Sequence, residues 1–183
     1  GQALALDSLH LNSNFRLAEV FRLEGQADSA ASYLDRLLRL KPDDLTYLEL
    51  QRKLAELYYT QQNFPLALRH YLRFAESDSS RQDPPLIELI ADLYEGQGEP
   101  ARALEWRQRL LRAGTGADSA GSAPADRVPI LDKMAELQVK AGDTKAALAT
   151  LGQLVQLDSL NRYAYYSRYA QVAEKGGDQA ARL

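Results

Sequence analysis

The side chains in this chain of 183 residues that are suited to chemistry are mainly carboxylates, because it has no cysteine and only two histidines. His10 and His70 have no carboxylate or second histidine at metal-ligand spacing, so we expect solvated or capping roles for both. Acid–base catalysis needs two carboxylates in a partly dry pocket that separates their pKa values, and helical stacks seldom supply one. The lack of cysteine excludes disulfides, thiolate metal sites and cysteine nucleophiles. We therefore predict no enzyme activity, no cofactor and no catalytic or metal-binding residue.

Nucleotides, nucleic acids and membranes are also disfavoured as ligands. The segment Gly-Gln-Gly-Glu-Pro at 96–100 resembles a phosphate-binding loop, but no strand precedes it and no Gly-Lys-Ser/Thr follows it, which favours a turn between helices. A net charge of −3 and a pI near 5.5 do not suit a surface that must neutralise phosphates. No apolar run approaches the roughly 20 residues of a membrane-spanning helix.

A repeated alanine spacing indicates the elements that position the carboxylates. Four times an alanine is followed twelve residues later by another, in the pairs Ala18 and Ala30, Ala55 and Ala67, Ala91 and Ala103, and Ala135 and Ala147. A methyl-sized side chain is needed where two antiparallel helices cross closely. Seven residues after each first alanine comes a residue for a helix-ending turn, namely Gly25, Gln62, Gly98 and Gly142. Three residues after each first alanine come Phe21, Tyr58, Tyr94 and Gln138, mostly large side chains that fill the space beside the small one. The spacing therefore predicts helical hairpins built to one plan.

This pattern resembles the tetratricopeptide repeat (TPR), a helix-turn-helix of 34 residues. The resemblance implies an all-α, right-handed superhelix, formed as a single array over residues 1–183. Its repeats are expected at 11–44, 48–81, 84–117 and 128–161, with a partial repeat at 163–183. Residues 2–8 are interpreted as the tail of an earlier repeat. The turn-rich segment 114–127 is expected to be a flexible loop between repeats, dispensable for folding.

The third repeat departs from the pattern at one core position, and the fifth repeat is rich in tyrosine. Where a large apolar residue should follow the second alanine by four, Leu34, Tyr71 and Leu151 comply, but the third repeat has Arg107 after Trp106, which indicates a rotated helix. In the fifth repeat, Tyr166 and Tyr169 fall at core positions, while Tyr165, like Tyr59, is expected to be exposed.

In the TPR family the first helix of each repeat lines a concave groove, and helical spacing around the crossing alanine gives the groove-facing positions. Nine of these twenty positions are acidic and two are basic, whereas the second helices are mostly basic. We predict a partner-binding acidic stripe of Glu19, Glu56, Glu88, Asp92, Glu95, Asp132 and Glu136. The alternative is that these charges only solvate the exposed face of each helix. An acidic groove would repel the carboxylate that TPR co-chaperone domains bind and would favour a cationic partner.

The resemblance further implies a non-catalytic scaffold. The array is similar to the periplasmic TPR scaffolds of Gram-negative exopolysaccharide exporters of the Pel type (PelB-like). That resemblance implies a protein partner such as a polysaccharide-modifying enzyme, and a cationic polysaccharide as the guided polymer, during biofilm polymer export across the outer membrane. No nucleic acid partner and no membrane insertion by this segment are expected. The alternative is a cytoplasmic regulatory or assembly-chaperone array that binds a basic peptide or subunit.

Overall fold

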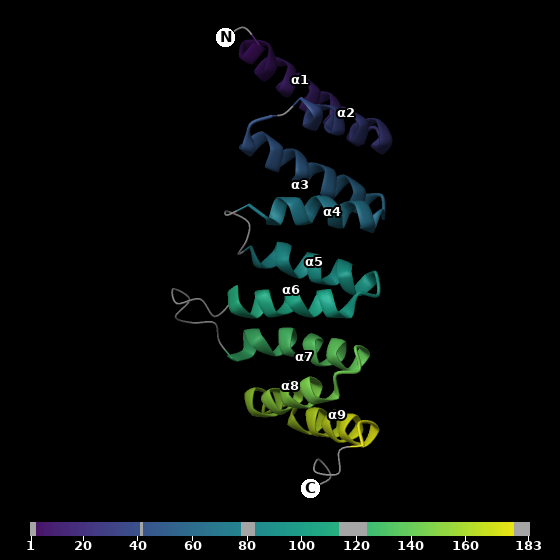
Figure 1. The fold of residues 1–183 in the computed structure, drawn as a ribbon, viewed down its shortest axis with the longest axis vertical. Helices are drawn as coiled ribbons and strands as arrows, with labels where there is room; N and C mark the ends of the chain where they lie inside the picture. Colours follow the sequence, from purple (N-terminus) through teal and green to yellow (C-terminus); the bar gives the residue numbers. More distant parts are fainter. Residues whose placement is uncertain (1–2, 41, 78–82, 114–123, 178–183) are drawn as a thin grey trace. The chain divides into compact units, whose positions relative to one another are not determined.

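The computed structural model describes residues 3–40, 42–77, 83–113 and 124–177, and these residues form nine α-helices and no strand. They group into two compact units, Gly1–Arg81 and Gln82–Leu183. The first unit contains α1 (Ala3–Leu23), α2 (Ala27–Arg39), α3 (Asp44–Thr60) and α4 (Phe64–Ala75). The second contains α5 (Pro84–Gly96), α6 (Pro100–Ala113), α7 (Pro124–Lys140), α8 (Thr144–Leu157) and α9 (Arg162–Lys175). Consecutive helices pair as hairpins within each unit (Figure 1), which confirms the all-α repeat architecture.

Each hairpin turns through the same hydrogen-bonded motif at the end of its first helix. Gly25, Gly98 and Gly142 adopt φ of 75°, 74° and 77°, and Gln62 adopts φ of 59°. In every turn the next residue donates its amide to the carbonyl five residues back, as Gln26 does to Phe21 at 2.8 Å. This geometry satisfies carbonyls that a helix end leaves without partners, and it needs the left-handed backbone that glycine adopts at least cost. The turn also begins the next helix: the side chains of Asn63 and Asp143 accept amide hydrogen bonds from Leu66 and Ala146.

Close helix crossing at small residues explains the packing of each hairpin. The eight crossing alanines are at most 3% exposed. In the first unit Ala18 and Ala30 lie in a core with Leu34, Leu37, Leu50 and Leu54, and Phe21 and Tyr33 pack against this core with their ring centroids 5.3 Å apart. In the second unit a comparable core forms around Leu131, Leu151 and Leu154. A larger residue at a crossing position would force the two helices apart.

Helix boundaries differ from the sequence-based expectation at two places. Residues 3–8 belong to the same continuous helix as Ala18, so they are not the tail of a separate, earlier repeat. Residues 124–127 form the first turn of α7, which continues through Pro129, so the segment between the third and fourth repeats ends earlier than predicted. The rest of the expected loop, 114–123, lies outside the described residues.

The α6 helix is not rotated, contrary to the prediction from Arg107. Arg107 occupies the core position and is only 3% exposed. Trp106 is half-buried, and the guanidinium carbon of Arg109 lies over its ring, 4.4 Å from the ring centroid. Arg107 is accommodated because its guanidinium reaches the carboxylates of Glu88 and Asp92 on α5. An ion pair therefore stands where the other repeats pack an apolar side chain.

Candidate functional site

The predicted acidic stripe lies on the first helices of the hairpins, with Glu19 on α1 and Glu56 on α3 in the first unit. In the second unit Glu88, Asp92 and Glu95 lie on α5, and Asp132 and Glu136 lie on α7. Their side chains are between 21% and 57% exposed, so every one of them reaches solvent. In the structure these carboxylates fall into separate groups, and each carboxylate forms an ion pair with an arginine or lysine side chain.

In the first unit the carboxylates pair with arginines on the same helix. The Arg22 Nε donates to Glu19 at 3.0 Å, and this hydrogen bonding lowers the pKa of Glu19. Arg52 donates to both Glu49 and Glu56 at 2.7 Å, and it likewise lowers the pKa of Glu49. Such pairs at i, i+3 and i, i+4 stabilise a helix modestly and cancel much of the carboxylate charge.

In the second unit the basic partners come from other helices as well. Arg107 on α6 holds Glu88 and Asp92. Lys140 on α7 donates to Glu95 on α5 at 2.6 Å and lowers its pKa. Arg168 on α9 donates to Asp132 on α7. Lys133 pairs with Glu136 at 3.2 Å. The Lys140 and Arg168 pairs connect first helices of neighbouring hairpins, α5 with α7 and α7 with α9, and the Arg107 pairs connect α5 with α6 within one hairpin.

The pairing changes what the stripe offers a partner. All seven predicted carboxylates carry an ion pair, so the net negative field is weaker than the count of acidic positions indicates. The sequence count included Arg22 and Arg52 but missed the other partners, because Lys133, Lys140 and Arg168 lie outside the counted positions and Arg107 reaches the stripe from a core position. Binding of a cationic partner by these residues stays a prediction.

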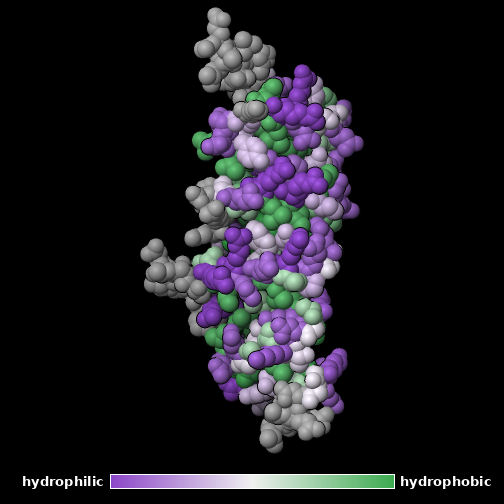
Figure 2. All heavy atoms as spheres, viewed as in Figure 1, coloured by the Kyte–Doolittle hydropathy of each residue, from purple (hydrophilic) through white to green (hydrophobic). Residues whose placement is uncertain are grey.

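A pocket in the first unit adds an apolar element to this surface. It has a volume of about 360 Å³ and lies between α1, α2 and α3. Five apolar side chains form its floor: Phe15, Ala18, Ala30, Leu34 and Leu57. Charged and polar side chains stand around it: Glu19, Arg22, Lys53, Glu56 and Thr60. The pocket therefore combines two residues of the predicted stripe with an apolar floor, in keeping with the interleaved hydrophilic and hydrophobic residues of Figure 2.

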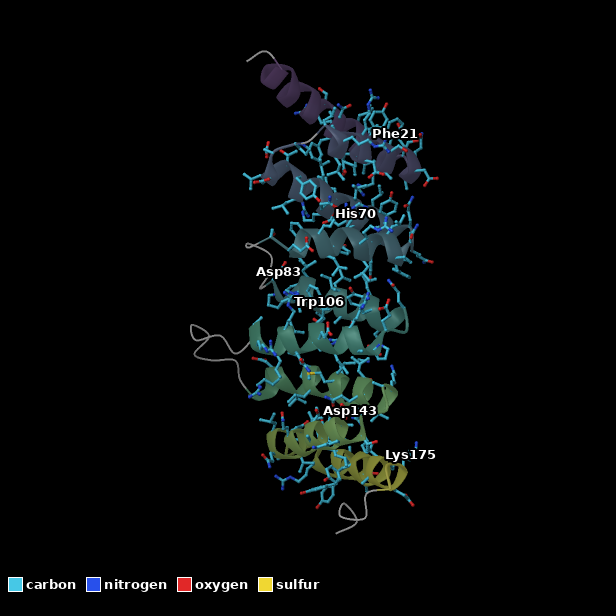
Figure 3. All side chains as sticks on the ribbon, viewed as in Figure 1. Phe21, His70, Asp83, Trp106, Asp143 and Lys175 are labelled. Atoms are coloured by element: carbon cyan, nitrogen blue, oxygen red, sulfur yellow. The ribbon has the colours of Figure 1, made fainter. Side chains whose placement is uncertain are left out.

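His70 is not solvated, contrary to the prediction. It is 7% exposed, its ring stacks on Tyr58 with ring centroids 5.5 Å apart, and its Nδ1 lies 2.7 Å from Gln51 Oε1. Figure 3 marks its place on α4. Burial lowers the pKa of His70. The sequence feature that could have predicted this contact is Gln51. It occupies a buried position where other repeats have the apolar residues Ile87 and Leu131. His10 lies outside the residues whose side chains the structure describes.

Two tyrosines of α9 exchange the roles predicted for them. Tyr165 is 6% exposed, packs in the second unit's core and donates a hydrogen bond to Asp158 at 3.1 Å, whereas Tyr166 is 54% exposed. Tyr169 packs against the same core. Tyr166 and the exposed Ala170 lie on the face that, in the other hairpins, contacts the second helix of the same repeat. The face toward α8 is the buried one, and Tyr165 belongs to it.

Neither a metal site nor a membrane span is found in the described part of the chain. Within those ranges no group of three or more histidine, aspartate or glutamate side chains is placed to hold a metal ion. None of the described helices combines the length and the apolar composition that crossing a bilayer requires.

Comparisons with known proteins agree on the repeat family. Tetratricopeptide repeat sequence models match residues 1–44 and 52–118 and residues 130–159. Similar solved structures include MamA, with 15% identity and a TM-score of 0.57 over 93% of this chain and 85% of that one. BtubC from P. vanneervenii has 15% identity and a TM-score of 0.54 over 98% and 85%. The P58(IPK) TPR domain has 17% identity and a TM-score of 0.55 over 94% and 47%. No curated protein sequence matches significantly.

Proposed function

Because this chain belongs to the tetratricopeptide repeat family, we propose that it is a non-catalytic scaffold that binds a segment of a partner protein on the faces of α1 and α3. The observation that carries this proposal is the first-unit pocket of about 360 Å³, which has an apolar floor and charged groups around it. Peptide-binding surfaces use this combination, since apolar pockets supply affinity and polar groups fix orientation.

The lining of the pocket defines the interaction. Burying one leucine or phenylalanine side chain of the partner against Leu34 and Leu57 contributes roughly 1.5–3 kcal/mol. Around the floor, Glu19 and Glu56 are balanced by Arg22 and Lys53, so the pocket attracts neither sign of charge strongly. We therefore propose an apolar anchor residue, with flanking polar groups that hydrogen-bond to the surrounding charges.

A bulky substitution beside the pocket tests the proposal. Peptides that bind the chain are selected from a phage-displayed library, and their affinities are compared for the wild type and Thr60→Trp. Thr60 is exposed and lines the pocket, so the indole should cover the floor without disturbing the core. Ala149→Trp is the control, because it places the same indole at an exposed position of α8 in the other unit.

We expect the selected peptides to share one large apolar residue and to lose most of their affinity for Thr60→Trp while keeping it for Ala149→Trp. Peptides without a shared apolar residue, or with equal affinity for both variants, would place the binding surface elsewhere.

The more specific proposal is a scaffold for exopolysaccharide export in the Gram-negative periplasm, which binds a polysaccharide-modifying enzyme and guides a cationic polymer. It is supported by the sequence resemblance and by the solvent access of the acidic stripe. Partly deacetylated poly-N-acetylglucosamine serves as a cationic probe. Its binding should weaken with added salt and in the variant Glu56→Gln/Glu136→Gln, whereas binding that is indifferent to both would refute the polymer role.

The alternative proposal is a cytoplasmic regulatory or assembly-chaperone array that binds a basic peptide or subunit, and it predicts a different cellular location. Cell fractionation of the native host, with antibodies against this chain, separates the two proposals. Recovery with periplasmic markers supports the exporter scaffold, and recovery with cytoplasmic markers supports the regulatory array.

A further inference from the structure

A second pocket lies in the second unit, between α7, α8 and α9. It has a volume of about 420 Å³. Val139 and Val172 supply its apolar surface, and Val139 is 43% exposed. Three basic side chains and one acidic side chain also line it: Lys140, Arg168, Lys175 and Glu136. Lys175 lies at the end of α9 (Figure 3).

The two pockets occupy equivalent places in the repeat pattern. Counted from Ala18 and Ala135, the residue one place later is Glu19 in the first pocket and Glu136 in the second. Counted from Ala55 and Ala170, the matching residues are Glu56 and Gln171, Leu57 and Val172, and Thr60 and Lys175. The pockets therefore share these lining positions, and the residue types at them give the two pockets a different chemistry.

The charges of the second pocket differ in sign from the acidic stripe. A glutamate of the first pocket is replaced by the neutral Gln171, and a threonine is replaced by Lys175. Glu136 is paired with Lys133, Lys140 with Glu95, and Arg168 with Asp132. Among the residues that the structure describes, Lys175 makes no ion pair. Its ammonium group keeps its hydrogen-bond donors available to a ligand.

We propose that this second pocket binds a partner segment in which an aspartate or glutamate stands next to an apolar side chain. The carboxylate accepts hydrogen bonds from Lys175, and the apolar side chain packs on Val139 and Val172. This inference rests on the proposed function and adds to it, because it assigns opposite preferences to two equivalent pockets: a neutral apolar anchor in the first and an acidic one in the second.

Defined peptides and NMR test the assignment. The probe is the end-blocked peptide Gly-Ser-Leu-Glu-Leu-Glu-Gly-Ser, and its matched controls carry glutamine or lysine in place of both glutamates. Each is titrated into the ¹⁵N-labelled chain while amide shifts are followed. Shift changes at Val139, Gln171 and Val172 report the second pocket, and changes at Leu34 and Leu57 report the first.

Two variants separate charge from fold. Lys175→Gln removes the ammonium group proposed to bind the carboxylate, and Gln171→Glu introduces the carboxylate that the first pocket has at this place. Because an exposed charge pair contributes modestly, we expect each variant to weaken the glutamate peptide by about threefold to tenfold. Arg73→Gln removes an exposed positive charge from α4 in the first unit and should leave the affinity unchanged. Circular dichroism checks that all three variants keep their helix content.

The expected result is binding of the glutamate peptide at the second pocket, weaker binding of the glutamine peptide, and no detectable binding of the lysine peptide. Shift changes confined to the first pocket, or equal affinities for the three peptides, would overturn the assignment while leaving the proposed scaffold function intact. Failure of the apolar-anchor test together with a positive result here would instead move the scaffold function to the second unit.

Discussion

Replacing Arg107 by methionine should preserve or raise stability, although it removes two ion pairs. The guanidinium is 3% exposed, and its Nε is buried with no hydrogen-bond partner among the described residues. Its partners Glu88 and Asp92 are 57% and 53% exposed, so water solvates both carboxylates once the arginine is gone. Methionine is a flexible apolar side chain that suits a position held by Leu34, Tyr71 or Leu151 in other repeats.

The magnitude follows from these exposures. The two ion pairs with half-exposed carboxylates stabilise the fold by up to about 1 kcal/mol each, and this is lost. Burying an apolar side chain instead stabilises the fold by roughly 1.5–3 kcal/mol. The cost of desolvating the guanidinium is also removed. We expect Arg107→Met to raise the free energy of unfolding by about 0–2 kcal/mol. The converse variant, Glu88→Gln/Asp92→Asn, leaves a buried cation without a counter-charge and should lower it by about 3 kcal/mol.

Urea denaturation followed by far-UV circular dichroism measures both variants. Arg102→Met is the control, because Arg102 forms an exposed pair with Glu99 and its loss should change stability by less than about 1 kcal/mol. The reasoning is refuted if Arg107→Met is destabilised by more than about 1 kcal/mol while the double variant is as stable as the wild type.

Three further predictions concern packing and titration. Gly176→Ala should destabilise the second unit, because a Cβ would lie 2.4 Å from the Thr144 methyl, and adding Thr144→Ser should restore stability. In Gly152→Ala the new Cβ meets no atom within 4 Å. Thermal melts of this variant should show a free energy of unfolding that is higher by about 0.5–1 kcal/mol. Burial lowers the pKa of His70 in the folded chain, so as the pH falls below 6.5 the unfolded chain binds a proton at this residue before the folded chain does. The contribution of His70 to stability is therefore fully present above that pH and declines below it. The urea midpoints of His70→Asn should show a flatter pH dependence in this range. Ala103→Glu buries a carboxylate at a 0% exposed crossing, costing several kcal/mol, and retained helix content with an unchanged melting temperature would contradict the repeat register.

The helical hairpins could be predicted from sequence because their determinants are local. A crossing alanine and the turn residue seven places later recur in each hairpin, and the register places Gln62 at a positive φ although it is not glycine. The boundary errors arose where a helix continues beyond the repeat: α1 begins at Ala3 and α7 begins at Pro124. Nothing in the spacing of the alanines limits how far a helix extends away from the crossing.

The ion pairs of the candidate site were harder to predict, because several of the partner side chains lie on a different helix. Lys140 is 45 positions from Glu95, and Arg168 is 36 positions from Asp132. Long flexible side chains on neighbouring helices reach each other only once the hairpins stack. The same holds for Tyr165 and Tyr166, whose exposure depends on which helix covers each face of α9.

This pairing determines how a charged partner interacts with the exposed face. A cationic partner gains a new ion pair with Glu56 only by competing with Arg52, which already donates to that carboxylate at 2.7 Å, so the net gain is smaller than that of an unpaired charge. Such contacts are also screened over about 8 Å at physiological salt. Apolar burial at Leu34 and Leu57, or at Val139 and Val172, is not weakened by salt in this way. Affinity should therefore come mainly from the two pockets, and the charges around them, above all Lys175, which has no ion-pair partner among the described residues, should decide which segment enters which pocket.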